Sequence, residues 1–154
     1  MSFVDTDCVI DVLREQRRGG RGPAHQKLEQ LGETPIYLGV FVLCELEAGA
    51  ARYHDPVEIQ RVRRLCQHFE VIYPDKRFAP QYGAILAALT QQKLTVATMD
   101  LLIGTLALVE NDTLVTRKVR HFEKIPHVRL DQYDGGHAGS GDRCQGHQAG
   151  GRRS

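Results

Sequence analysis

The stretch FVDTDCVIDVL, residues 3–13, joins a short apolar run to an amphipathic segment. Residues 3–4 predict a strand that ends at Asp5, because an apolar run stops there at a charged side chain. Asp7 is expected to cap the helix that follows, since the apolar positions in residues 9–13 recur at helical spacing. The stretch therefore predicts a strand, a turn and a helix.

The same alternation of strand and helix continues along the chain. Further strands are expected at residues 36–38, 71–73, 113–116 and 128–130. Further helices are expected in a segment that ends at Gly32, at 40–53, in a segment that begins at Pro56, at 80–93, and at 99–110, where Thr98 would be the cap. The strands are short apolar runs rather than alternating ones, which indicates a parallel sheet covered by helices on both faces. The predicted fold class is α/β, with a mostly parallel sheet of four to five strands.

The length of 154 residues, with 42% hydrophobic and 25% charged residues, suits one domain of ordinary size. We expect the domain to span residues 1–133. Residues 134–154 hold seven of the 15 glycines and almost no apolar side chain, which predicts a flexible Gly-rich tail. The longest apolar stretches, 36–44 and 101–109, are about half the roughly 20 residues of a bilayer span, so no membrane association is expected.

The four cysteines are far apart in sequence and form no C-x-x-C pair, which argues against a structural zinc site. We interpret them as reduced thiols in a cytoplasmic protein. Cys8 and Cys44 flank two acidic residues without a histidine pattern that would make either a nucleophile, and both are expected to be small buried residues.

The charge balance excludes a global electrostatic field for a nucleic acid, because 20 Lys and Arg face 19 Asp and Glu. Any polyanion site must therefore be local. The candidates for phosphate contacts are Arg14, Arg17, Arg18, Arg21, Arg52, Arg117, Lys118 and Arg120. The basic residues within 61–64 are interpreted as a solvated helix face.

Three acids stand where the predicted parallel sheet would bring them together. Asp5 ends the first strand, Glu45 lies in the helix after the second, and Asp100 lies in the first turn of the helix before the fourth. Converging carboxylates repel one another, and a hard divalent cation such as Mg²⁺ or Mn²⁺ relieves that repulsion. Each acid also has an ordinary interpretation as a strand-end, solvated or helix-dipole residue. Glu47 points about 200° away from Glu45, so only one of the two can face the crevice.

Four blocks follow one another along residues 1 to about 133. They are Phe3-Val4-Asp5-Thr6-Asp7, Cys44-Glu45-Leu46-Glu47-Ala48-Gly49, Met99-Asp100-Leu101-Leu102-Ile103-Gly104-Thr105-Leu106-Ala107 and Leu114-Val115-Thr116-Arg117-Lys118-Val119-Arg120-His121-Phe122. The last block is followed by Glu123-Lys124-Ile125-Pro126. In this order the blocks resemble the PIN domain family, and more narrowly VapC-type toxins.

The resemblance implies a three-layer α/β/α sandwich and a Mg²⁺-dependent endoribonuclease that hydrolyses RNA as the toxin of a toxin–antitoxin pair. Asp5, Glu45 and Asp100 would form the catalytic and metal-binding cluster, with Mn²⁺ as a substitute ion. Thr6, Asp7 and Thr116 would support that cluster. A cognate antitoxin covering the crevice and a homodimer of the chain are also implied.

Two positions depart from the resemblance. Asp7 stands where Asn is common, so it either adds negative charge near the metal or caps the helix. Lys118 stands where an acid or Asn is frequent, and a protonated lysine cannot ligate a cation. Lys118 would weaken a second metal site, grip a substrate phosphate or lower the activity. His121, nearby, is interpreted as packed or exposed rather than as a general base.

Two alternatives stay open at this point. The spacing Asp5-x-Asp7 also matches the nucleophile motif of haloacid-dehalogenase-like phosphatases, in which the first Asp is phosphorylated. The departure at Lys118 also allows a PIN-like domain without catalysis that binds RNA or a protein partner.

Overall fold

A computed structural model describes residues 1–134, so residues 135–154 of the predicted Gly-rich tail, with its two histidines, lie outside the described residues. The strands are β1 (Ser2–Val4), β2 (Ile36–Gly39), β3 (Glu70–Ile72), β4 (Thr113–Thr116) and β5 (Arg129–Gln132). The helices are α1 (Thr6–Arg17), α2 (Pro23–Gln30), α3 (Val40–Tyr53), α4 (Pro56–Cys66), α5 (Phe78–Gln91), α6 (Thr98–Val109) and α7 (Val119–Phe122).

All five strands form one parallel sheet in the order β3-β2-β1-β4-β5. The first strand of the chain is therefore the central one, with β2 on one side and β4 on the other. The chain builds outward from β1 through β2 and β3, and then returns to start the other half at β4. The carboxyl ends of β1 and β4 meet where the strand order reverses, which is where parallel sheets open a crevice for ligands.

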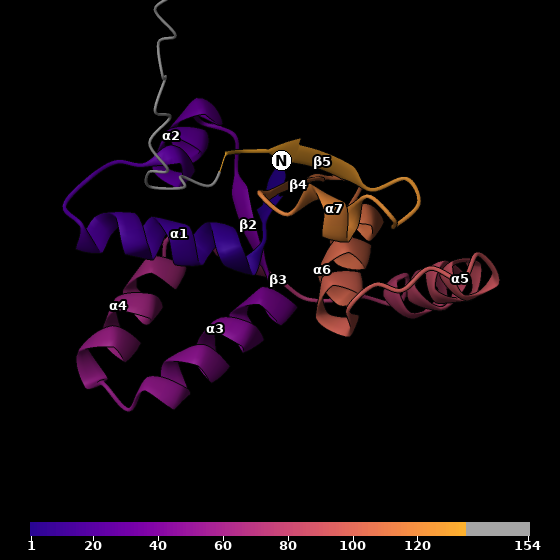
Figure 1. Ribbon diagram of the computed structural model, residues 1–154, viewed down its shortest axis with the longest axis horizontal. Helices are drawn as coiled ribbons and strands as arrows, with labels where there is room; N and C mark the ends of the chain where they lie inside the picture. Colours follow the sequence, from indigo (N-terminus) through magenta and orange to yellow (C-terminus); the bar gives the residue numbers. More distant parts are fainter. Residues whose placement is uncertain (135–154) are drawn as a thin grey trace, which may run out of the picture.

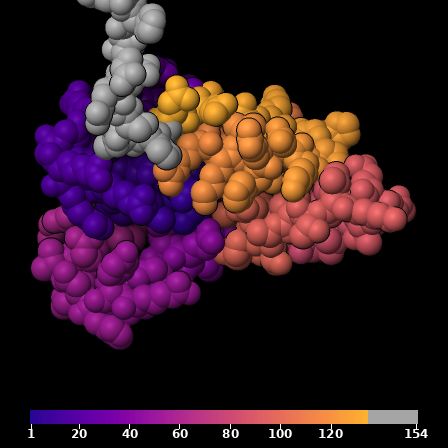
Figure 2. All heavy atoms as spheres, viewed as in Figure 1, coloured from indigo at the N-terminus to yellow at the C-terminus, as the bar shows by residue number. Residues whose placement is uncertain are grey.

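Helices flank this sheet and confirm the expected α/β sandwich (Figure 1). α1 packs against β4, whereas α6 packs against β2 and β4. Fully buried side chains at the sheet and on α3, α6 and α7 fill the core: Leu38, Val42, Leu101, Leu106, Leu114 and Phe122. Figure 2 shows the α3–α4 pair and the α5 segment as two lobes on either side of the central body.

A close contact between α6 and the segment after α7 depends on a glycine. A Cβ atom added at Gly104 would lie 2.5 Å from Cδ1 of Ile125. Glycine at this position lets α7 and its neighbours approach α6 closely. As a result, side chains of α7 reach the first turn of α6.

The predicted elements are largely confirmed, and two helix caps are corrected. The helix at 40–53 and the strand at 113–116 have the predicted bounds. Asp7 does not cap α1, because Asp5 occupies the cap position and its side chain accepts a hydrogen bond from the Cys8 amide. Thr98 is the first residue of α6 rather than its cap, and Ala97 precedes the helix without a side-chain cap.

The cysteines of the described residues are free thiols, and one of them corrects a prediction. Cys8 is buried as expected, whereas Cys44 is exposed. Cys44 lies on the solvent side of α3, between the inward-facing Val42 and Leu46. Cys144 falls outside the described residues. Over residues 1–134, no helix has the length and apolar content needed to cross a membrane.

Candidate active site

Asp5 lies at the switch point of the sheet, directly after β1, and its carboxylate is buried. Its Oδ1 accepts a hydrogen bond from the Cys8 amide at 2.8 Å. Its Oδ2 accepts one from the Thr116 hydroxyl at 2.5 Å, which comes from the end of β4. Residues at the ends of two neighbouring parallel strands thus meet here, and the Thr116 hydroxyl contacts the carboxylate of Asp5 directly.

The environment of Asp5 disfavours its charge. Burial raises the pKa of the Asp5 carboxyl to about 6, although the hydrogen bonds from Thr116 and Cys8 oppose that shift. The nearby Asp7 carboxylate raises the pKa further, and the Lys118 ammonium lowers it. A buried carboxyl with a raised pKa in a cleft is typical of a functional site.

The three predicted acids line one cavity of about 360 Å³ at this edge of the sheet. Its walls also include Thr6, Asp7, Ile10, Ala48, Gly49, Arg52, Ile103, Lys118 and Phe122. The prediction that Asp5, Glu45 and Asp100 meet at one crevice therefore agrees with the structure. They come from the start of α1, the middle of α3 and the first turn of α6.

Glu45 faces this cavity, and its neighbour Glu47 does not. The Thr6 hydroxyl donates a hydrogen bond to Oε2 of Glu45, so the supporting role predicted for Thr6 has a direct contact behind it. Glu47 pairs instead with the Arg63 guanidinium of α4, at 3.1 and 3.2 Å. The helical geometry that separates the two glutamates is as expected.

Asp100 has a partner that the sequence analysis did not assign to the site. Nδ1 of His121 lies 3.0 Å from Oδ2 of Asp100, which joins α7 to the first turn of α6. His121 is exposed, as predicted, yet it also orients a cavity carboxylate. Nothing in the spacing of two residues on separate elements signals this contact between α6 and α7.

Asp7 and Lys118, the two departures from the resemblance, contact one another. Nζ of Lys118 lies 2.5 Å from Oδ2 of Asp7, and the Arg117 guanidinium lies 3.7 Å from Oδ1. The hydrogen bond to Asp7 raises the pKa of the Lys118 ammonium, with further contributions from the charges of Asp100 and Asp5. Lys118 therefore brings a firmly protonated cation into the acidic cavity.

The donor set fits a hard divalent cation by its chemistry. Carboxylate oxygens are the ligands that Mg²⁺ and Mn²⁺ prefer, and Asp5, Glu45 and Asp100 offer them around one cavity. Within residues 1–134, however, no three Asp, Glu, His or Cys side chains converge as a preformed coordination sphere. Each acid is held by a protein partner, Thr116, Thr6 or His121 respectively.

The predicted phosphate-binding residues divide into three groups: those in the acidic cavity, those in a neighbouring cavity, and those in neither. Arg52 and Lys118 line the acidic cavity itself. Arg14 and Arg17 line a smaller neighbouring cavity that also includes Glu45, and each forms an ion pair, with Asp11 and Glu58 respectively. Arg117 pairs with Asp7 and Asp11, Arg21 pairs with Glu29, and Arg18 and Arg120 are exposed.

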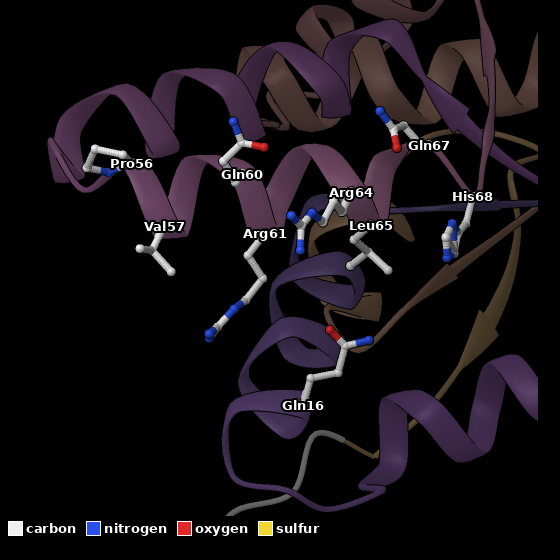
Figure 3. A pocket seen from close by; sticks show the side chains of 9 residues that line it. All are labelled: Gln16, Pro56, Val57, Gln60, Arg61, Arg64, Leu65, Gln67 and His68. Atoms are coloured by element: carbon white, nitrogen blue, oxygen red, sulfur yellow. The ribbon is translucent and has the colours of Figure 1, made fainter.

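A second and larger cavity, of about 690 Å³, lies between α1 and α4 (Figure 3). The Arg61 and Arg64 side chains, from α4, and Gln16, from α1, project into the same space. No carboxylate is among the residues that line it: Gln16, Pro56, Val57, Gln60, Arg61, Arg64, Leu65, Gln67 and His68. The lining therefore lacks the carboxylates of the acidic cavity, although this cavity is the larger of the two.

Comparison with known proteins identifies the class. The sequence profile of the PIN domain matches residues 2–128, so the chain belongs to the PIN domain family. Within that family it is similar to Ribonuclease VapC2 of Rickettsia felis, with 30% identity over 112 residues that cover 71% of this chain and 84% of the relative. This membership excludes the haloacid-dehalogenase-like alternative.

Solved structures have the same fold. The VapBC2 structure from Rickettsia felis, bound to a DNA fragment from its promoter, superposes with a TM-score of 0.77 at 25% identity, covering 86% of this chain and 98% of the other. A toxin–antitoxin complex from Klebsiella pneumoniae superposes with a TM-score of 0.60 at 26% identity, covering 83% and 95% of the two chains.

Proposed function

We propose that this PIN domain is the toxin of a toxin–antitoxin pair and cleaves RNA as a metal-dependent endoribonuclease. The observation that carries the proposal is the single cavity lined by Asp5, Glu45 and Asp100 at the switch point of the sheet. The similarity of the chain to Ribonuclease VapC2 supports RNA as the substrate. The toxin–antitoxin complex among its structural neighbours supports an antitoxin as the protein partner.

Asp5, Glu45 and Asp100 would hold Mg²⁺, with Mn²⁺ as a substitute. Held by these acids, the cation would supply a water molecule of lowered pKa and a positive charge for the phosphate. The side chains around the acids keep them in place for this task. Thr116 and the Cys8 amide hold Asp5, Thr6 holds Glu45, and His121 holds Asp100.

Arg52 is our candidate for binding the RNA backbone at the cavity. It is a cation on the cavity wall, at the end of α3, and a guanidinium suits bidentate contacts to phosphate oxygens. The Lys118 ammonium is already paired with Asp7 and is less available for that purpose. A homodimer remains a prediction, which light scattering of the purified chain would measure.

The test compares two glutamates on the same helix. Glu45→Gln removes a cavity carboxylate, whereas Glu47→Gln removes one that pairs with Arg63 outside the cavity. We expect Mg²⁺-dependent cleavage of RNA by the wild type and by Glu47→Gln, and none by Glu45→Gln or in the presence of a chelator. Equal cleavage by the two variants would overturn the proposed site. RNA binding without any cleavage by the wild type would favour the non-catalytic alternative.

A further inference from the structure

Negative charges outnumber positive ones among the side chains that line the acidic cavity. Four carboxylates face it, from Asp5, Asp7, Glu45 and Asp100, and they are opposed by two cationic side chains, from Arg52 and Lys118. The lining therefore sums to a charge of −2 when every acid is ionised, because four negative charges meet two positive ones. One divalent cation is enough to neutralise it.

Lys118 differs from Arg52 because its backbone is fixed to the centre of the site. The Lys118 amide donates a hydrogen bond to the Thr116 hydroxyl oxygen at 2.9 Å. The same hydroxyl donates to Asp5, so Lys118 has a defined position relative to the buried acid. Its ammonium is then anchored at 2.5 Å from Asp7.

This anchoring explains how an acidic cavity accommodates both Asp7 and Lys118. Without Lys118, Asp7 would add a fourth carboxylate charge to the cavity, opposed only by the more distant Arg117 guanidinium at 3.7 Å. Without Asp7, the Lys118 ammonium would have no carboxylate anchor, and its charge already interacts with those of Asp100 and Asp5. Paired, the two side chains neutralise each other and leave Asp5, Glu45 and Asp100 for a metal ion.

We propose that the Lys118 ammonium, anchored on Asp7, is a built-in cation that takes the place of a second metal ion, so that the cavity binds a single divalent cation. This inference rests on the proposed function. It assigns Lys118 as a positioning residue that sets the metal stoichiometry of the site.

Calorimetric titration with Mn²⁺ tests the inference without measuring catalysis. The wild type is expected to bind one Mn²⁺ per chain. Lys118→Met removes the charge but keeps the aliphatic stem, and is expected to bind Mn²⁺ about tenfold more tightly, since a nearby positive charge has gone. Lys118→Asp is expected to bind a second Mn²⁺. Lys76→Met, at an exposed lysine outside the cavity lining, controls for the loss of one positive charge and should match the wild type.

Unfolding of the metal-free protein tests the anchor on Asp7. We expect the effects of Asp7→Asn and Lys118→Met on stability to be non-additive in the double variant, because each removes the same ion pair. Strictly additive effects would overturn the anchoring by Asp7.

The outcomes separate this inference from the proposed function. Two Mn²⁺ ions bound to the wild type with similar affinity, or an unchanged affinity in Lys118→Met, would overturn the built-in cation and leave the nuclease proposal intact. A wild type that binds no Mn²⁺ and does not cleave RNA would overturn the proposed function itself.

Discussion

The acidic cavity is smaller than the α1–α4 cavity, yet it holds the carboxylates that the larger one lacks. The acidic cavity measures about 360 Å³ and gathers four carboxylates from three parts of the chain. The α1–α4 cavity measures about 690 Å³ and presents arginine, glutamine and histidine side chains without a carboxylate (Figure 3). The topology of the sheet creates the first, because residues after parallel strands converge at the switch point. The convergence of charge, rather than volume, distinguishes the candidate site.

The largest expected effect separates the two cavities by activity. Asp100→Asn should lower RNA cleavage by about 100-fold or more, because a lost metal ligand removes several kcal/mol of transition-state stabilisation. Arg64→Ala, in the larger cavity, should change cleavage by less than about threefold. Initial rates on a defined RNA at saturating Mg²⁺ measure both. A loss in Arg64→Ala as large as that in Asp100→Asn would break the comparison.

A second prediction concerns the free energy of unfolding, which the buried carboxylate of Asp5 lowers. Asp5→Asn keeps the cap of α1, since Asn caps helices as well as Asp. It should stabilise the metal-free protein by about 3 kcal/mol at pH 7 to 8, because the pKa of Asp5 rises from 3.8 to about 6 on folding. Urea unfolding in a chelator measures this difference.

The pH dependence of that difference has a defined sign. Well below pH 3.8, at about pH 2, the Asp5 carboxyl is protonated in both the folded and the unfolded chain, so wild type and Asp5→Asn should differ little. As the pH rises from 4 through 6, the unfolded chain ionises first and the wild type loses stability relative to the variant. A stability difference between the wild type and Asp5→Asn that becomes smaller with rising pH would contradict the desolvation of Asp5.

A third prediction concerns His121, which holds Asp100 from α7. Removing a group that orients a metal ligand weakens metal binding by about 10-fold in comparable sites. His121→Asn should therefore lower Mn²⁺ affinity by about that factor. His127→Asn, at an exposed position in the following loop, is the matched control, and calorimetry measures both. Equal affinities of the two variants would remove His121 from the site.

The smallest expected effect is on RNA binding. Arg52→Ala should weaken RNA affinity modestly and lower the slope of log affinity against log salt by about 1, as for the loss of one phosphate contact. Arg61→Ala, in the larger cavity, should leave the slope unchanged. Binding is measured by fluorescence anisotropy with Ca²⁺ in place of Mg²⁺. A larger change in Arg61→Ala would make the α1–α4 cavity the RNA-binding surface.

The parts of the fold that the sequence predicts are those that local spacing determines. The apolar spacing after Gly39 predicts α3 with its bounds, and the run Thr113–Thr116 predicts β4. The convergence of Asp5, Glu45 and Asp100 follows from the rule for parallel strand ends together with the family resemblance. These predictions need no knowledge of which side chains touch.

The predictions that fail or are missing depend on contacts between distant residues. Asp5 and Asp7 are equally good caps by type, and the helix start at Thr6 decides between them. The contacts of Lys118 with Asp7 and of His121 with Asp100 join separate elements, so spacing along the chain carries no sign of them. Cys44 is exposed because only one side of α3 faces the core.

The central position of β1 has a consequence for the protein during its synthesis. The hydrogen bond between Thr116 and Asp5 joins residues 111 positions apart, and β1 pairs with β4 along its whole length. A nascent chain that has left the ribosome only as far as α6 lacks the strand that completes the crevice. Truncated products that end before Thr113 are therefore expected to be harmless to the cell that makes them.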